Sequence, residues 1–359
     1  MEVGILGLPG VGKTSLFNAL TSGGHVIGSQ SPTKPNVGVV PVPDERLQRI
    51  NELIETKRVV PATVKVTDVA GVAGKTKGDD LGGKFLAFIR EADAVLEVVR
   101  CFEDPNVPHI EGSVDPVRDV EATEMELVLA DLETLEKNID KQRKHARSGD
   151  KEALAAIATI EAVIPMLQRG QTIRTMALKP EQIKFLHSLG LLSDKKVMYI
   201  ANVGEDDIAG QSPLVQKLRQ RVEAGGGVVV PVCAKLEAEL TELEPADREQ
   251  MLKDLGMKEP ALKAVTQAVY KLLGLQSFFT VGEDEIKAWT IPVGATAPQA
   301  AGAIHTDFEK GFIRAEVYHF EDLMQYKTEA AIKAAGKTRA EGKNYIFKDG
   351  DITHFLFNR

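Results

Sequence analysis

The sequence predicts an α/β fold with a mostly parallel sheet, which is interrupted by an antiparallel helical hairpin and followed by a smaller α+β domain. Three observations support this prediction. Residues 3–6 form a short apolar run of strand type, residues 7–14 read GLPGVGKT, and residues 14–20 have helical spacing. Residues 120–167 carry the apolar spacing of two long helices, and from residue 276 onward short strand patterns return.

Length and composition are those of a folded protein with more than one domain. The chain has 359 residues, of which 43% are hydrophobic and 27% charged. A net charge of −8 argues against a protein that coats nucleic acid through bulk electrostatics, although it leaves room for a local basic patch. Two cysteines make no disulfide framework, and no apolar run approaches the roughly 18 residues that span a bilayer, so we expect a cytoplasmic protein without export signal or membrane anchor.

Residues 7–14 match the complete Gly-x4-Gly-Lys-Ser/Thr phosphate-binding loop. Glycines let successive backbone N–H groups turn toward an anion, and the helix N-terminus adds its dipole. We expect Lys13 to reach the β- and γ-phosphates and the Thr14 hydroxyl to coordinate Mg²⁺. The residues expected to contact the nucleotide here are Pro9, Gly10, Val11, Gly12, Lys13, Thr14 and Ser15.

The polar stretch 25–34 is the candidate for a first switch loop, whose hydroxyl completes the Mg²⁺ shell. Thr33 is the first choice, ahead of Ser31 and Ser29, and an ordinary surface loop is the alternative. The apolar run 36–42 that follows has strand character.

A second strand pattern, 62–67, ends in the sequence DVAG at 68–71. Asp68 can hold the metal through water, and the backbone N–H of Gly71 can approach the γ-phosphate. Val72 stands where many GTPases have the glutamine that orients the attacking water. Because valine cannot hydrogen-bond water, either hydrolysis is slow or another group positions the nucleophile.

Beyond a helix at 86–92 and a strand at 94–99, the chain leaves the α/β pattern. Residues 120–147 and 154–167 have the spacing of two helices joined by a turn at 148–150. The predicted seam consists of Met125, Val128, Leu132, Leu135 and Ile139 on one helix and Leu154, Ile157, Ile160, Ile164 and Leu167 on the other. The turn is basic, which fits either a solvated tip or a tip that contacts phosphates.

The strand patterns 196–201 and 227–232 end where P-loop GTPases recognise the base. A guanine site uses Asn-Lys-x-Asp, but this chain has Asn202, Val203 and Glu205 at those positions. An Asn amide can match adenine N6 and N7, so the sequence favours ATP, although Glu205 could still reach guanine. Cys233, Ala234 and Lys235 follow the second strand and complete the predicted base site.

From residue 276 the pattern changes to that of a small α+β module. Strands are expected at 278–281, 286–292 and 312–318, with a short helix at 297–305 and two more strands around a turn in 345–357. The predicted domains are therefore 1–119 and 195–275 for the nucleotide domain, 120–194 for the inserted hairpin and 276–359 for the C-terminal module.

With these residues in view, the chain closely resembles the YchF family of Obg-like ATPases over essentially its whole length. The phosphate loop, the DVAG sequence, residues 200–205 (IANVGE) and residues 288–302 (AWTIPVGATAPQAAG) carry the likeness, together with residues 305–315 of the C-terminal module. The resemblance implies a G domain of the TRAFAC class interrupted by a helical hairpin, and a C-terminal β-grasp module of the TGS type. It also implies Mg²⁺-dependent hydrolysis of ATP, with GTP used less well.

The resemblance further implies ribosome association, on the large subunit or the whole ribosome, with contact to ribosomal RNA through the hairpin tip and the TGS module. A role in translation or stress response follows, whereas DNA and membranes are not expected partners. The family carries a hydrophobic residue at the place of Val72 and a histidine that is His109 here. His109 is therefore the expected water-orienting residue after loop closure, and an ordinary surface loop histidine is the alternative. Two departures are Gly10, where many relatives have Asn tied to potassium dependence, and a short first switch loop.

The function that these residues predict is an ATP-hydrolysing regulatory switch that binds the ribosome and cycles between ATP and ADP. A GTP-preferring translational GTPase and a ribosome- or RNA-binding module with little hydrolysis are the alternatives. A small-molecule kinase would use the same loop, but it needs an acceptor pocket and an arginine-rich lid that the sequence does not indicate.

Overall fold

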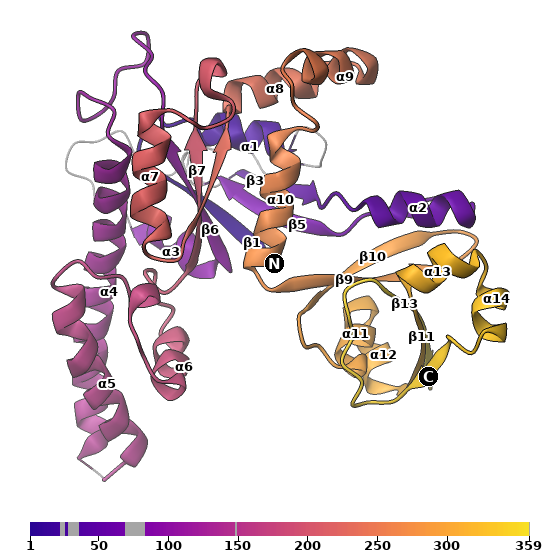
Figure 1. Ribbon diagram of the computed structural model, residues 1–359. Helices are drawn as coiled ribbons and strands as arrows, with labels where there is room; N and C mark the ends of the chain where they lie inside the picture. The colour runs from indigo at the N-terminus through magenta and orange to yellow at the C-terminus, as the bar shows by residue number, and fades with distance from the viewer. Residues whose placement is uncertain (22–25, 28–35, 69–82, 148, 359) are drawn as a thin grey trace. The chain divides into compact units, whose positions relative to one another are not determined.

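The computed structural model describes residues 1–21, 26–27, 36–68, 83–147 and 149–358. Its contacts divide the chain into two compact units. The first unit comprises Met1–Val39 and Lys65–Leu262, and the second comprises Val40–Val64 and Lys263–Arg359. Each unit has a sheet of its own (Figure 1).

A seven-stranded sheet in the order β2-β3-β5-β1-β6-β7-β8 forms the centre of the first unit. Its strands are β1 (Glu2–Leu6), β2 (Val26–Ile27), β3 (Asn36–Pro41), β5 (Thr63–Asp68), β6 (Ala94–Arg100), β7 (Lys196–Asn202) and β8 (Val228–Val232). β1 pairs in parallel with β5 and β6, and β6, β7 and β8 continue in parallel, which confirms the predicted mostly parallel sheet. The carboxyl ends of these strands therefore meet at one edge, where α/β proteins bind ligands.

The helices of the first unit pack either on this sheet or on one another beyond its edge. They are α1 (Lys13–Thr21), α3 (Gly83–Glu91), α4 (Pro116–Ala146), α5 (Lys151–Leu167), α6 (Pro180–Ser188), α7 (Pro213–Glu223), α8 (Ala234–Glu242) and α9 (Pro245–Asp254), with short 3₁₀ turns η2 (Ile173–Thr175) and η3 (Glu205–Asp207). Ile89 of α3, Leu127 of α4 and Leu218 of α7 join residues of β6 and β7 in one buried cluster. β6 and β7 are buried along almost their whole length, as expected for central parallel strands.

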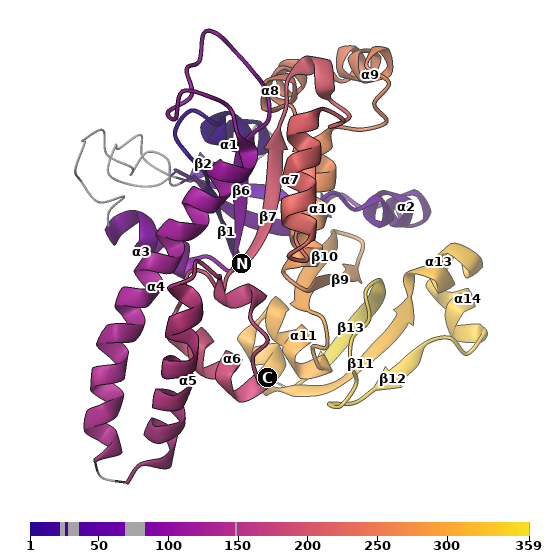
Figure 2. The ribbon, with the colours of Figure 1, turned by 60° about the vertical axis from the view of Figure 1, so that its left-hand side comes forward.

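α4 and α5 form the predicted antiparallel hairpin, which runs away from the sheet (Figure 2). Asp115 and Asp150 cap the two helix N-termini by accepting backbone N–H groups. The predicted seam is wrong at two positions, because Met125 and Leu154 are 45% and 52% exposed. Small residues, among them Ala153 and Ala156, are buried on α5 in the first turns instead.

The hairpin is not an isolated two-helix coiled coil. The predicted seam assumed that the two helices pack only on each other, so it was partly wrong. The buried cluster around Leu135 and Ile160 also contains Ile173, Met176 and Leu186 from η2, the segment after it and α6. The fully buried carboxylate of Asp131 accepts the backbone N–H groups of Leu192 and Ser193 at 2.7 and 2.8 Å, and the Ser193 hydroxyl at 2.6 Å. These bonds fix α4 to the segment that leads into β7.

The second unit is built on a six-stranded sheet in the order β12-β11-β13-β9-β10-β4. Its strands are β4 (Val59–Val60), β9 (Leu275–Val281), β10 (Ile286–Pro292), β11 (Phe312–His319), β12 (Arg339–Glu341) and β13 (Asp351–Phe357), and its helices are α2 (Glu45–Leu53), α10 (Ala261–Leu272), α11 (Ala297–Ile304), α12 (Thr306–Lys310), α13 (Phe320–Tyr326) and α14 (Glu329–Ala334). Phe278 and Phe347 pack edge to face at 5.2 Å in a core that also contains the alanines of α11.

The contacts group this part of the chain differently from the predicted domains, and one expected strand does not form. Residues 40–64, including α2, belong to the second unit rather than to the nucleotide domain, because Arg46 of α2 pairs with Asp349 at 2.8 Å and lies over the Phe279 ring at 5.0 Å. Likewise, the contacts place the start of the second unit near Lys263 rather than at 276. Residues 345–347 form only an isolated bridge, between Thr296 and Ile346, instead of the expected strand.

Candidate nucleotide-binding site

The loop of residues 7–12 connects β1 to α1 in a conformation that depends on its glycines. Gly7, Gly10 and Gly12 have φ values of 142°, 77° and 98°, which L side chains rarely adopt. A Cβ on Gly7 would lie 2.4 Å from the Val98 carbonyl oxygen, and one on Gly12 would lie 2.3 Å from Asn202 Nδ2. Gly10 therefore serves the turn, whereas Gly7 and Gly12 serve both the turn and the close approach of neighbouring strands.

Lys13 folds back over the loop and donates hydrogen bonds from Nζ to the carbonyl oxygens of Gly7 and Leu8, at 2.8 and 2.7 Å. Burial lowers the pKa of Lys13 to about 8, and the nearby Asp68 carboxylate opposes this shift. A triphosphate would offer this ammonium several anionic oxygens in place of two neutral carbonyl groups, so this side chain is suited to bind the β- and γ-phosphates.

Thr14 and Asp68 lie together beside the loop, as the sequence predicts. The Thr14 hydroxyl donates to Asp68 Oδ2 at 3.1 Å, and Asp68, at the end of β5, is 1% exposed. A hydroxyl and a carboxylate are hard oxygen donors of the kind that Mg²⁺ prefers. No group of three or more His, Cys, Asp or Glu side chains in the described part of the chain forms a closed metal cage. A Mg²⁺ held here would therefore take most of its ligands from phosphate and water.

Thr33 and Gly71, with Ser29, Ser31 and Val72, fall outside the described residues. Their expected contacts with Mg²⁺, γ-phosphate and water thus stay predictions.

Asn202, at the end of β7, ties the phosphate loop to the next strand end. Its Nδ2 donates to the Val11 carbonyl oxygen at 2.8 Å, and its Oδ1 accepts the Ala234 backbone N–H at 3.1 Å. Only one of the two Nδ2 hydrogens is needed for Val11, so the other can reach a purine acceptor such as N7, which adenine and guanine share. The expected double contact with adenine N6 and N7 stays a prediction, since Oδ1 already has a backbone partner.

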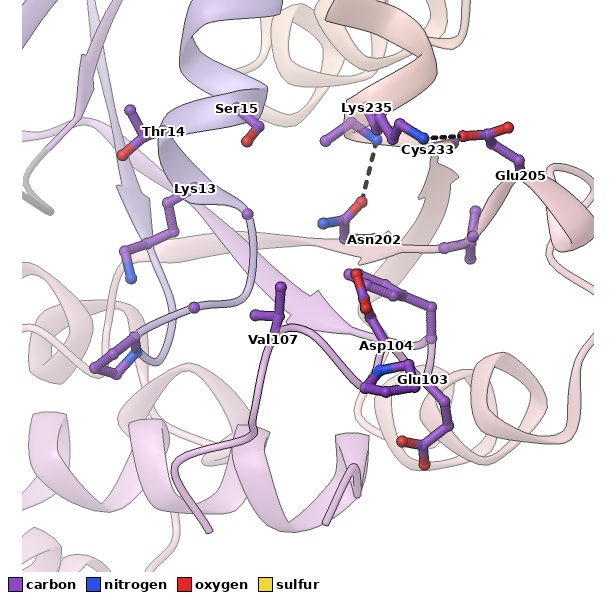
Figure 3. A pocket seen from close by; sticks show the side chains of 18 residues that line it. Lys13, Thr14, Ser15, Glu103, Asp104, Val107, Asn202, Glu205, Cys233 and Lys235 are labelled. Atoms are coloured by element: carbon purple, nitrogen blue, oxygen red, sulfur yellow. Dashed lines mark hydrogen bonds and ion pairs between the residues drawn. The ribbon is translucent and has the colours of Figure 1, made fainter. Parts of the chain in front are cut away.

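The other predicted base-site residues surround Asn202. Val203 is 2% exposed, and its backbone N–H donates to the Val232 carbonyl oxygen. Its side chain therefore offers no polar group to a base. Glu205 begins η3, and Lys235 lies in the first turn of α8, which begins directly after Cys233. Lys235 Nζ donates to Glu205 Oε1 at 2.7 Å (Figure 3).

These segments line one cavity of about 810 Å³ at the carboxyl edge of the sheet. Val11, a predicted nucleotide contact, is 1% exposed and is not among the lining residues, but its carbonyl oxygen accepts a hydrogen bond from Asn202, which is. The lining comprises Pro9, Gly10, Gly12, Lys13, Thr14, Ser15, Phe102, Glu103, Asp104, Pro105, Val107, Asn202, Val203, Gly204, Glu205, Cys233, Ala234 and Lys235. The structure thus brings together most of the predicted phosphate and base residues (Figure 3).

The wall formed by residues 102–107 is absent from the sequence prediction. Arg100, at the end of β6 and 2% exposed, holds this loop by donating to the carbonyl oxygens of Phe102, Asp104 and Val107. Its guanidinium also lies 4.7 Å from the centre of the Phe102 ring. An arginine at the end of a mostly apolar central strand was the available signal, because such a charge needs nearby acceptors when it is buried.

His109 does not line this cavity. Its side chain is 2% exposed, Nε2 lies 2.8 Å from Asp119 Oδ2, and Nδ1 accepts the Glu111 backbone N–H at 3.1 Å. Arg118 also binds Asp119, at 2.9 Å. Both ring nitrogens are therefore engaged, and the water-orienting role stays a prediction that requires His109 to leave Asp119.

The comparisons with known proteins cover both units. Residues 2–130 match a family described as 50S ribosome-binding GTPase, and residues 275–358 match the YchF-GTPase_C family, described as a protein of unknown function. Proteins named Ribosome-binding ATPase YchF are 49% identical in Haemophilus ducreyi, over 99% of both chains, and 44% identical in Bacillus subtilis, over 100% of this chain and 99% of the relative. The solved structure titled as the Schizosaccharomyces pombe YchF GTPase superposes with a TM-score of 0.89 at 36% identity, covering 99% of this chain and 97% of that one.

Proposed function

The chain belongs to the YchF family, and from this premise we propose that it is a ribosome-binding switch that hydrolyses ATP to ADP and phosphate, with GTP as a poorer substrate. One observation carries most of the weight. A complete phosphate loop and the Asn202, Glu205 and Lys235 region line the same cavity, which has about the volume of a nucleotide site.

Catalysis in such a site depends on positioning and on charge stabilisation more than on covalent chemistry. Lys13 would move from its carbonyl partners to the β- and γ-phosphates, and backbone N–H groups of the loop would bind phosphate oxygens. Thr14 and Asp68 would hold Mg²⁺, which neutralises phosphate charge when bound. With Val72 in place of a glutamine, slow intrinsic turnover is expected.

ATP preference is proposed because Asn202, Val203 and Glu205 do not reproduce the guanine-reading Asn-Lys-x-Asp fork. The relatives' names do not agree on the base, since the bacterial relatives are called ATPases and the fission-yeast structure is titled a GTPase. A GTP-preferring enzyme is therefore the competing function, and Glu205 is the residue that would support it.

Ribosome binding is proposed through the hairpin tip and the C-terminal module. Lys141, Lys144 and His145 are exposed at the end of α4, and Arg147 and Lys151 are exposed beside the turn. Clustered cations on a chain with a net charge of −8 are suited to a phosphate backbone. Ribosome binding would place the protein in the cytoplasm. No helix in the described part of the chain is long and apolar enough to cross a membrane.

The test is to titrate ATP and GTP in parallel by calorimetry, followed by phosphate release with and without ribosomes. We expect tighter binding of ATP, slow release alone and faster release with ribosomes. Lys13→Ala should weaken binding of both nucleotides, because it removes a phosphate ligand common to them. A wide preference for GTP would contradict the proposed specificity, and failure to bind either nucleotide would contradict the proposed function.

A further inference from the structure

Two charged side chains from different loops meet at the base side of the cavity. Glu205 follows β7 and Lys235 opens α8, and their Nζ···Oε1 distance is 2.7 Å. Their side chains are 54% and 73% exposed, and both line the cavity (Figure 3). The pair therefore faces the space in which a base would be recognised.

The chemistry of this pair bears on which purine the site accepts. Guanine presents two neighbouring donors, N1–H and the N2 amine, and a carboxylate binds both when each of its oxygens accepts one hydrogen. Adenine has an acceptor at N1 and no N2 amine, so it cannot form these two hydrogen bonds with a carboxylate. With Lys235 bound to Oε1, one of the two Glu205 oxygens already has a charged partner, and the ammonium beside it repels the guanine donors, so the two-oxygen contact with guanine is weakened.

We propose that Lys235 is a specificity-determining residue, which weakens the binding of guanine by Glu205 and so biases the site toward adenine. This inference rests on the proposed function, since it concerns the same nucleotide cavity. Asn202 does not distinguish adenine from guanine in this arrangement. Its Oδ1 accepts the Ala234 backbone N–H, and its remaining Nδ2 hydrogen can bind N7, which both purines have.

Other carboxylates that line the cavity do not replace Glu205. Glu103 and Asp104 lie on the loop after β6, on another side of the cavity from α8 (Figure 3). Asp104 Oδ1 accepts the Asn106 backbone N–H at 2.9 Å, which holds that side chain within its own loop. Asp206, the neighbour of Glu205, is absent from the cavity lining.

The expected effect is modest, because ion pairs between exposed side chains are weak. Freeing Glu205 should improve GTP binding relative to ATP by about two- to fivefold. The ratio of the two dissociation constants is the proper measure. ATP and GTP carry the same triphosphate, so a general loss of positive charge near the phosphates cancels in the ratio.

The experiment compares wild type, Lys235→Met and the double variant Lys235→Met with Glu205→Gln, with ATP and GTP titrated in parallel at low salt. Methionine keeps most of the length of lysine and removes its charge. We expect Kd(GTP)/Kd(ATP) to fall about two- to fivefold in the single variant and to return toward the wild-type value in the double variant. Raising the salt should lower the wild-type ratio and leave that of Lys235→Met unchanged, because salt screens exposed ion pairs.

Lys253→Met is the matched control. Lys253 pairs with Glu249 at 2.6 Å on α9, its side chain is 65% exposed, and it does not line the cavity. An unchanged ratio in Lys235→Met, or an equal change in Lys253→Met, would overturn the proposal. If wild type itself prefers GTP, the proposed ATP preference fails, whereas the shift between wild type and Lys235→Met remains measurable and tests Lys235 separately.

Discussion

At the scale of single residues, the roles proposed for His109 and Lys13 each require the side chain to leave its present hydrogen-bond partners. The His109 ring is held by Asp119 and the Glu111 backbone N–H. The Lys13 ammonium is held by two carbonyl oxygens of its own loop. To act in the proposed roles, each side chain would have to exchange these hydrogen bonds for contacts with phosphate or water. Single hydrogen bonds contribute little net free energy, so such an exchange is feasible.

His109→Ala is predicted to slow phosphate release by about tenfold or more while leaving the Kd for ATP nearly unchanged, because a water-orienting group acts only in the chemical step. The measurement is single-turnover phosphate release beside calorimetric ATP binding. Since a buried histidine also supports its loop, His109→Gln serves as a second variant that keeps a hydrogen-bonding side chain. Normal hydrolysis in both variants, with normal ATP binding, would remove His109 from the mechanism.

Lys13 predicts a pH dependence of nucleotide binding. With a pKa of about 8 in the free protein, Lys13 loses its proton as the pH rises from 7 to 9. Because the triphosphate binds the charged form, ATP affinity should fall across this range, and binding at pH 9 should take up a proton. Calorimetry in two buffers of different ionisation enthalpy measures that uptake. Lys13→Arg stays charged and should show neither effect, and equal proton uptake by this variant would assign the titration elsewhere.

At the scale of elements, a buried polar cluster joins the central strands to the hairpin. Its members are Glu97 of β6, Tyr199 of β7, Glu124 of α4, Arg174 of η2 and Arg221 of α7. Arg221 donates to Glu124 Oε2 at 2.8 Å, and Tyr199 donates to Glu124 Oε1 at 3.0 Å. β6 and β7 both end at the cavity, so this cluster connects α4 with the two strands that lead to the nucleotide site.

Glu97 makes this cluster sensitive to pH. Burial raises its pKa to about 8, with Glu124 adding to the shift and Arg174 opposing it. The folded state therefore holds a proton that the unfolded chain releases near pH 4.5, so between these values stability falls as the pH rises. Glu97→Gln has no such proton, and its melting temperature relative to wild type should increase from pH 6 to pH 8.5. A constant difference over that range, measured by calorimetry, would contradict the raised pKa of Glu97.

At the scale of the whole molecule, the chain contains two units with separate sheets and cores. Relatives match it over 99% or more of its length, so the two units occur together in them. A nucleotide can switch ribosome binding only to the extent that it binds the competent and the incompetent states with different affinity.

We therefore predict that ribosome affinity differs at least about fivefold between the protein with a non-hydrolysable ATP analogue and the protein with ADP, a ratio typical of coupled sites. The measurement is co-sedimentation with ribosomes at three nucleotide states, including none. Lys13→Ala, which should bind nucleotide weakly, is expected to show one affinity in all three. Equal affinities for the wild-type protein would favour a binding module in which the nucleotide is only structural.

The sequence alone determined the features that depend on short-range pattern. A strand, a phosphate loop and a helix follow one another within the first 20 residues, so GLPGVGKT identified the phosphate site directly. The same holds for Asp68 and Asn202, which end strands that can be recognised locally, and for the hairpin, whose two helices are joined by a short turn. The parallel order of the sheet followed from these strands and the long connections between them.

Only the tertiary structure decided which distant segments share a surface. The grouping of residues 40–64 with the second unit and the choice of side chains buried in the hairpin each depend on partners far away in the chain. Lys235 and Glu205 are 30 positions apart, and nothing in their local sequences indicates that they pair. The periodicity of hydrophobic and charged residues indicates which face of a helix or strand is buried. It does not indicate which distant segment packs against that face, because that depends on the tertiary fold.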